Sequence, residues 1–323
     1  MRENLLYCLT ILACMNNKIK SILSIVLFAT YPTLSKFALE SNSPAVVAFL
    51  TEILTGVILL FSFGIYPELK KIRRLHGHKA FWIFLSMGFL AGVVGPLAMQ
   101  IGYTHSTVLN GVLLISLQTP LVIILAKFFL NEKIHLNHVI GISVSVTGLV
   151  AYATDLFTVM PHFSRYDVYF LIAAVAFACS NIIYKKKISH VSHELVLIVR
   201  NLIGGLTIFA GMIFFSVEGN IPVSFDQKSM LAIGVIVLVP IIMAQSLWYS
   251  ALTQIKAREA AFFDTLYPLF AAGIAFVVLN ESISTFQFIG GTIMMSGILI
   301  SQFHWHLSRN SWQDFRLQHF KQH

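Results

Sequence analysis

Long, uninterrupted apolar blocks are the feature of this sequence that most restricts its fold. A helix needs about 20 apolar residues to cross the hydrocarbon layer of a bilayer, whereas the strands of a membrane barrel alternate apolar and polar residues over about ten positions. The blocks here are continuous, and they predict an all-α integral membrane protein with ten transmembrane helices. The predicted helices lie near residues 21–39, 45–66, 80–103, 107–130, 137–157, 167–184, 193–216, 229–251, 259–279 and 285–304.

Charge and composition exclude several classes of protein. With 57% apolar and 11% charged residues, the chain has too little charge to cover the surface of a soluble enzyme, and a coiled coil or a disordered chain is equally excluded. The net charge of +8 does not predict nucleic-acid binding, because the basic residues lie in short segments between the apolar blocks. If the N-terminus is inside, all Lys and Arg residues of the loops except Arg165 and Lys228 also lie inside. This pattern predicts a bacterial inner-membrane protein with both termini in the cytoplasm.

The sequence repeats itself at an offset of 149 residues. The clearest matches are an N-E-x-I turn and, after it, two glycines seven residues apart, namely Asn131/Asn280, Glu132/Glu281, Gly141/Gly290 and Gly148/Gly297; Lys36/Lys185 and Gly56/Gly205 match earlier in each copy. Each copy contains five predicted helices, an odd number, so the second copy is expected to be inverted in the membrane, as in many secondary transporters. The predicted organisation is an N-terminal segment (1–18), repeat 1 (19–157), repeat 2 (167–304) and a cytoplasmic amphipathic tail (305–323). Translation from Met15 rather than Met1 is an alternative start.

Residues 102–150 and 249–299 resemble the EamA domain of the drug/metabolite transporter superfamily. The shared features are an aromatic residue at the end of the third helix, a proline within the fourth, a turn that contains Glu, and two glycines seven residues apart. The resemblance implies a ten-helix metabolite permease with a central cavity, from which the fifth and tenth helices stand apart. It also implies a basic residue in the second helix of each copy, which is present as Arg200 in the second copy. The first copy has Thr51 and Glu52 there instead.

Glu52 and Arg200 are the candidate substrate- or proton-binding residues with the strongest physical argument. Glu52 follows Pro44 by eight residues and therefore lies about 12 Å into the membrane; ionisable groups at that depth are costly and usually face a cavity or a partner. A carboxyl group that gains and loses a proton there suits a proton carrier. Arg200 corresponds to Thr51 under the repeat, so the two charges could bind the ends of a zwitterion, or they could form a structural ion pair.

Other polar and aromatic residues inside the predicted helices are candidates for lining the cavity. They are Tyr31, Tyr103, Gln118, Asn181, Trp248 and Tyr249, together with Gln100 and Gln245. Asp264 is a further candidate, although a position in the first turn of a helix also explains it. Lys36, Lys127 and Lys185 lie near helix ends, where their side chains are expected to extend toward the membrane surface. The sequence has no Walker A motif, no glycine-rich dinucleotide turn, and no HExxH or CxxC spacing beside its two HxxH pairs, His135/His138 and His190/His193. No cofactor and no metal are therefore expected.

These features together predict a secondary transporter, more specifically an exporter, that moves a small polar or amphipathic metabolite such as an amino acid by alternating access. Proton coupling or exchange would drive it. Two alternatives stay open: an uptake permease or exchanger, and an integral-membrane enzyme that acts on lipid, which would require an acidic or histidine cluster at one membrane surface. The expected partners are the substrate and the lipid bilayer, and the chain is expected to be a monomer or a homodimer.

Overall fold

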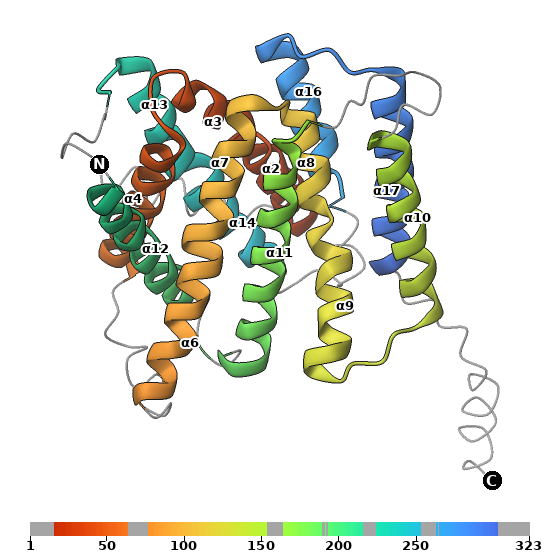
Figure 1. The fold of residues 1–323 in the computed structure, drawn as a ribbon, viewed down its shortest axis with the longest axis horizontal. Coiled ribbons are helices and arrows are strands. Elements are labelled where there is room, and N and C mark those ends of the chain that lie inside the picture. The colour runs from red at the N-terminus through yellow and green to blue at the C-terminus, as the bar shows by residue number, and fades with distance from the viewer. Residues whose placement is uncertain are drawn as a thin grey trace.

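The computed structural model describes residues 16–63, 77–153, 164–188, 191, 193–215, 224–252, 263 and 265–302. All regular secondary structure in these ranges is helical, and seven of the helices there are long and apolar enough to cross a membrane. The helices stand side by side in a bundle (Figure 1). The predicted all-helical membrane fold is therefore confirmed, while the count of ten transmembrane helices stays a prediction. The segment before residue 16, with Met15, and the tail from residue 303 lie outside the described residues.

The helices follow the predicted apolar blocks, often as two or three consecutive elements per block. The first half contains α2 (Asn17–Phe28), α3 (Tyr31–Leu39), α4 (Pro44–Phe63), α6 (Gly77–Phe89), η1 (Leu90–Val94), α7 (Gly95–His105), α8 (Val108–Ser116), α9 (Gln118–Leu130) and α10 (Leu136–Ala153). The second half contains α11 (Asp167–Ile183), η2 (Tyr184–Ile188), α12 (His193–Phe215), α13 (Gln227–Ile236), η3 (Val237–Met243), α14 (Ala244–Leu252), α16 (Tyr267–Leu279) and α17 (Thr285–Gln302). We call the end of the bundle with the start of α8 the upper end and the end where α9 finishes the lower end, as in Figure 1.

Two turns of π-helix accompany prolines in the third and eighth predicted helices. η1 lies just before α7, which has Pro96 in its first turn, and η3 contains Pro240. Proline lacks a backbone N–H, and its ring clashes with the carbonyl group four residues earlier. A wider π turn relieves this clash within a continuous helix. The two elements thus interrupt the α-helical hydrogen bonding at matching places of the two repeats.

α10 and α17, the fifth helix of each repeat, pack against one another (Figure 1). They run antiparallel, because Gly141 lies against Ser301 and Gly297, whereas Gly148 lies against Met294 and Gly290. The hydroxyl of Ser145 donates a hydrogen bond to the carbonyl oxygen of Met294, 3.3 Å away and 149 residues later in the chain. Small residues permit this close approach of two backbones in a membrane.

The contact between α4 and α12 has the same reciprocal form. Gly56 lies against Leu202, and Gly205 lies against Ile53; Gly205 and Leu202 are the residues that the 149-residue repeat matches to Gly56 and Ile53. A contact in which residue i meets j′ while i′ meets j is what a two-fold axis between the helices generates.

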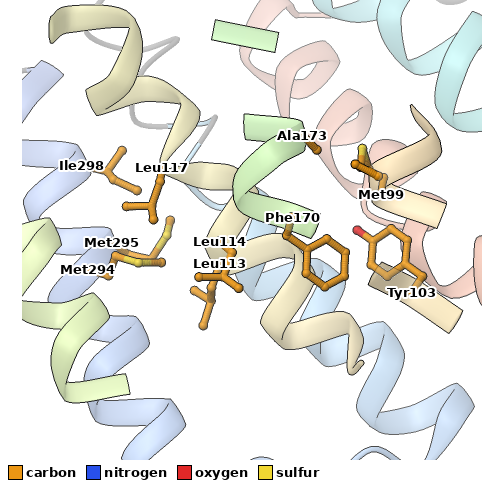
Figure 2. Close-up of a cluster of buried hydrophobic side chains, with 11 residues drawn as sticks. Met99, Tyr103, Leu113, Leu114, Leu117, Phe170, Ala173, Met294, Met295 and Ile298 are labelled. Atoms are coloured by element: carbon orange, nitrogen blue, oxygen red, sulfur yellow. The ribbon is translucent and has the colours of Figure 1, made fainter. Parts of the chain in front are cut away.

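A buried hydrophobic cluster joins the α10–α17 pair to the rest of the bundle (Figure 2). Tyr103 of α7 packs on Phe170 of α11, with ring centroids 4.9 Å apart. On the other side of the cluster, Leu117 faces Met295 and Ile298 of α17 (Figure 2). This cluster fills the middle of the molecule beside the cavity described next.

Candidate functional site: a cavity between the two repeats

A cavity of about 290 Å³ lies in the lower half of the bundle. α2, α8 and α9 line it from the first repeat, and α14, α16 and α17 line it from the second. We call it the main cavity. Its lining residues are Ser24, Ile25, Phe28, Ile115, Ser116, Gln118, Thr119, Ala244, Gln245, Trp248, Thr265, Tyr267, Met295, Ile298 and Gln302.

The lining combines aromatic rings with amide side chains. Phe28, Trp248 and Tyr267 supply the rings, and those of Phe28 and Tyr267 lie 5.5 Å apart. The serine hydroxyls are used within the protein, since Ser24 and Ser116 donate to backbone carbonyl oxygens. Within the described part of the chain, no hydrogen bond is formed by the amides of Gln118 and Gln245. These amides are therefore available to a ligand in the cavity, and the rings offer flat apolar surface.

The predicted site residues are distributed over several places. Gln118 and Trp248 line the main cavity. Asn181 is exposed on α11, and Tyr103 is buried against Phe170. The side chain of Tyr249 and all of Asp264 lie outside the described residues.

Glu52 and Arg200 lie on neighbouring helices, α4 and α12, and not in the lining of the main cavity. Glu52 lies near Arg200, but the guanidinium Nε of Arg200 donates its hydrogen bond to Oδ1 of Asn201 at 3.1 Å. The Oε2 atom of Glu52 is buried and has no hydrogen-bond partner. A carboxylate oxygen in that condition is energetically costly.

Tyr31 and Gln100 form a polar contact beside Glu52. The amide Nε2 of Gln100 donates to the hydroxyl of Tyr31 at 3.1 Å, and Tyr31 lies near Glu52. Gln100 is fully buried, and its Oε1 atom lacks a partner. Tyr31 follows Phe28, a lining residue of the main cavity, and their rings stack at 6.5 Å. The polar contact of Tyr31 with Gln100 therefore lies at the upper boundary of the main cavity.

The upper end contains a buried hydrogen-bond network that the sequence analysis did not identify. Asp167, at the start of α11, is fully buried. It accepts hydrogen bonds from the hydroxyl of Ser106, from Nδ2 of Asn110 at 3.0 Å and from the backbone N–H of Ser164 at 2.7 Å. Gln287 of α17 continues the network by donating to Oδ1 of Asn110 at 3.1 Å. The network fastens α8, α11 and α17 together at this end.

A second set of polar contacts closes the other side of the upper end. Asn42, between α3 and α4, is buried; its Nδ2 donates to the hydroxyl of Ser229 on α13 at 2.7 Å, and its Oδ1 accepts from the N–H of Ser224 at 2.9 Å. The hydroxyl of Ser229 donates to the carbonyl oxygen of Ala38. These hydrogen bonds are difficult to predict from the sequence, because the partners lie more than 180 residues apart in the chain.

Comparison with known proteins places the chain in a family. The model of the EamA-like transporter family matches it twice, at residues 19–154 and 164–303. The chain belongs to the EamA-like transporter family. The two matches correspond to the two halves of the helix bundle, and the resemblance found in the sequence is confirmed.

Several known proteins are similar to this chain over more than half of its length. An uncharacterised transporter of Methanothermobacter thermautotrophicus is 26% identical over 87% of this chain and 84% of its own. A riboflavin transporter of Fusobacterium nucleatum is 24% identical over 88% and 98%, and a protein of Escherichia coli named as a probable amino-acid metabolite efflux pump is 24% identical over 59% and 66%. A protein of known crystal structure shares the fold, with a TM-score of 0.59 and 16% identity over 88% of this chain and 96% of its own. The family and the names of these relatives support a multi-pass membrane transporter, and the similar crystal structure supports the fold alone.

Proposed function

We propose that this EamA-like transporter is an exporter of a small polar or amphipathic metabolite, such as an amino acid or a related compound, and not an enzyme. The main cavity carries this proposal: it is lined by both repeats, and it presents free amides beside aromatic rings. Such a lining suits a substrate with hydrogen-bonding groups and an apolar or planar part. Two relatives named for amino-acid metabolites and for riboflavin are consistent with a substrate of that kind.

The transport mechanism proposed is alternating access between two inverted five-helix repeats, which together supply ten transmembrane helices. The antiparallel packing of α10 on α17 and the reciprocal contacts of α4 with α12 support the inversion. A two-fold axis that relates antiparallel helices lies perpendicular to them, and hence in the plane of the membrane. In repeats of this kind the substrate site lies between the halves, and their relative rocking exposes it to each side in turn.

Orientation follows from charge. With both termini in the cytoplasm, the lower end of the bundle faces the cytoplasm of a bacterial cell and the main cavity lies on the cytoplasmic side of the closed upper end. Lys185, Lys186 and Lys187 of η2 lie at that lower end, in agreement with the excess of basic residues on the cytoplasmic side of membrane proteins.

Proton coupling through Glu52 is the proposed source of energy. Its buried, unpartnered carboxylate oxygen and the neighbouring contact of Tyr31 with Gln100 support this role. These groups lie between the main cavity and the upper end. A proton bound there can bias which end opens, since protonation removes a charge from the packed interior.

An untargeted comparison of metabolites tests the proposed function. Cells that express the wild-type chain are compared with cells that express Trp248→Ala, which removes a ring from the main cavity. Trp82→Ala is the matched control, since Trp82 is 65% exposed on α6 and does not line the main cavity. We expect at least one small polar metabolite to be depleted in the cells and enriched in the medium for wild type and Trp82→Ala only. Identical profiles for all strains, including cells without the protein, would refute the proposal.

A further inference from the structure

Two of the ion pairs that connect the repeats in the described part of the chain lie at opposite ends of the bundle. At the upper end, Nζ of Lys36 lies 3.1 Å from Oε1 of Glu281. At the lower end, Nζ of Lys185 lies 2.6 Å from Oε1 of Glu132. Each pair joins one residue of the first repeat to one of the second.

The two pairs are equivalent under the 149-residue repeat. Lys185 is the counterpart of Lys36, and Glu281 is the counterpart of Glu132. Each lysine lies toward the C-terminal end of the first helix of its repeat, and each glutamate follows the fourth helix of the other. The helices next to these residues pack in the same equivalent pairs, α3 with α16 and α11, which η2 continues, with α9.

The backbone at the two glutamates is also the same. The residue before each, Asn131 or Asn280, is a left-handed helix cap with φ of 54° or 53°, a conformation that asparagine adopts more easily than most residues. The N–H of Glu132 then donates to Ala126 at 3.3 Å, and that of Glu281 donates to Ala275 at 3.4 Å. Both turns therefore present a carboxylate at the corresponding position, one at each end of the bundle.

The environments of the two pairs differ. The side chains of Lys36 and Glu281 are 25% and 14% exposed, and both carboxylate oxygens of Glu281 also accept from the N–H of Val108, at 2.9 and 3.1 Å. The side chains of Lys185 and Glu132 are 57% and 47% exposed. Water screens an exposed pair strongly. The upper pair is therefore the more firmly engaged of the two in this conformation, and the main cavity lies toward the lower end.

We propose that the two ion pairs are matched gates of the transport cycle, with Lys36–Glu281 holding the upper end closed in this conformation. In the opposite conformation Lys185 and Glu132 become the buried, firmly engaged pair and hold the lower end closed. The inference rests on the proposed alternating access. The four charged residues of the two pairs control the equilibrium between the two conformations. Loss of either pair shifts that balance toward opening of its own end.

Reaction of a thiol in the main cavity with a membrane-impermeant maleimide tests the gates without knowledge of the substrate. The reporter is Ser116→Cys in a chain whose three cysteines, Cys8, Cys14 and Cys179, are replaced by serine. Labelling is measured in right-side-out and in inside-out vesicles. Lys36→Gln is expected to raise the rate from the upper end about fivefold and to lower it from the lower end, since about 1 kcal/mol corresponds to that factor. Lys185→Gln is expected to raise the rate from the lower end.

Two further variants make the test specific. The charge exchange Lys36→Glu with Glu281→Lys should bring the labelling rates part of the way back, because the pair can form again although the N–H of Val108 loses its carboxylate acceptor. Lys228→Gln is the matched control: Lys228 pairs with Glu40 at 2.5 Å, also at the upper end, but Glu40 has Ser189 and no acid as its counterpart. Its rates should stay within about twofold of the reporter chain, as expected for an exposed pair.

The outcomes separate the gates from the proposed function when exchange of metabolites by the same variants is measured in proteoliposomes. Unchanged labelling in a folded Lys36→Gln protein, or an equal change in Lys228→Gln, would overturn the gates even if exchange persists. Absence of exchange in the wild type, with labelling that shifts as expected, would instead refute the transport function and leave the two-state gate standing.

Discussion

Replacement of Gly141 by alanine is expected to destabilise the protein by about 1–3 kcal/mol, the usual cost of extra volume in a well-packed contact. A Cβ atom at Gly141 would lie 2.6 Å from the carbonyl oxygen of Gly297 and 2.6 Å from Cα of Ser301, both of them backbone atoms. Ordinary contact begins at 3.4 Å, and the backbone N of Ser301 would be closer still, so α10 and α17 must separate locally by at least about 0.8 Å. A gap of that size forfeits a quarter to a half of the dispersion energy of the atoms on either side.

Gly297→Ala should cost a similar amount, because its Cβ would lie 2.6 Å from the carbonyl oxygen of Gly141. The double variant should cost less than the sum, since one separation of the helices accommodates both methyl groups. Gly273→Ala on α16 is the matched control: its Cβ would meet nothing within 4 Å, and alanine favours a helix over glycine. Unfolding by sodium dodecyl sulfate in mixed micelles gives the free energies. Equal stability of Gly141→Ala and Gly273→Ala would refute the close contact of α10 and α17.

Three other predictions address polar groups and topology. Asp167→Asn should lower the free energy of unfolding by about 1.5–3 kcal/mol, as expected for buried hydrogen bonds to a charged group; a loss below about 0.5 kcal/mol in the same unfolding assay would contradict the network. Glu52→Gln should fold normally but abolish the dependence of transport on a pH gradient, whereas gradient-driven transport by this variant would exclude Glu52 as the carrier. If Glu52 and Arg200 are instead a structural pair, each single neutralisation should cost about 3–5 kcal/mol and the double one should recover much of it. A cysteine in place of Arg165 should be labelled from outside intact cells, and one in place of Lys187 only after permeabilisation; the opposite pattern would invert the topology.

The helices could be predicted from the sequence because a bilayer requires long apolar segments whose backbone hydrogen bonds are satisfied internally. The predicted block 107–130 is occupied by α8 and α9, from Val108 to Leu130, and the predicted block 285–304 by α17. The breaks within blocks were less evident. A proline predicts a local distortion of a helix. The sequence does not determine whether that distortion is a kink between two helices or a π turn such as η1.

The site was predicted only in part. Gln118, Gln245 and Trp248 were candidates because they are polar or aromatic residues inside the predicted helices, and all three line the main cavity. Ser24 and Tyr267 also line it but were not among the candidates. Lys36 was expected to extend toward the membrane surface, but its pairing with Glu281 at 3.1 Å could not be predicted from the sequence. That partner lies in the other repeat, and only the relative placement of the two repeats brings the charges together.

Counterflow with the purified protein tests the central claim, that this chain itself moves a metabolite through the main cavity. Proteoliposomes are loaded with an unlabelled extract of cell metabolites. They are then placed in an extract of the same metabolites labelled with ¹³C. We expect at least one labelled small polar metabolite to accumulate inside with the wild type and with Trp82→Ala, and Trp248→Ala to abolish or strongly slow the accumulation. If the folded wild-type protein accumulates no labelled compound above the level in protein-free liposomes, transport of a metabolite through the main cavity is refuted.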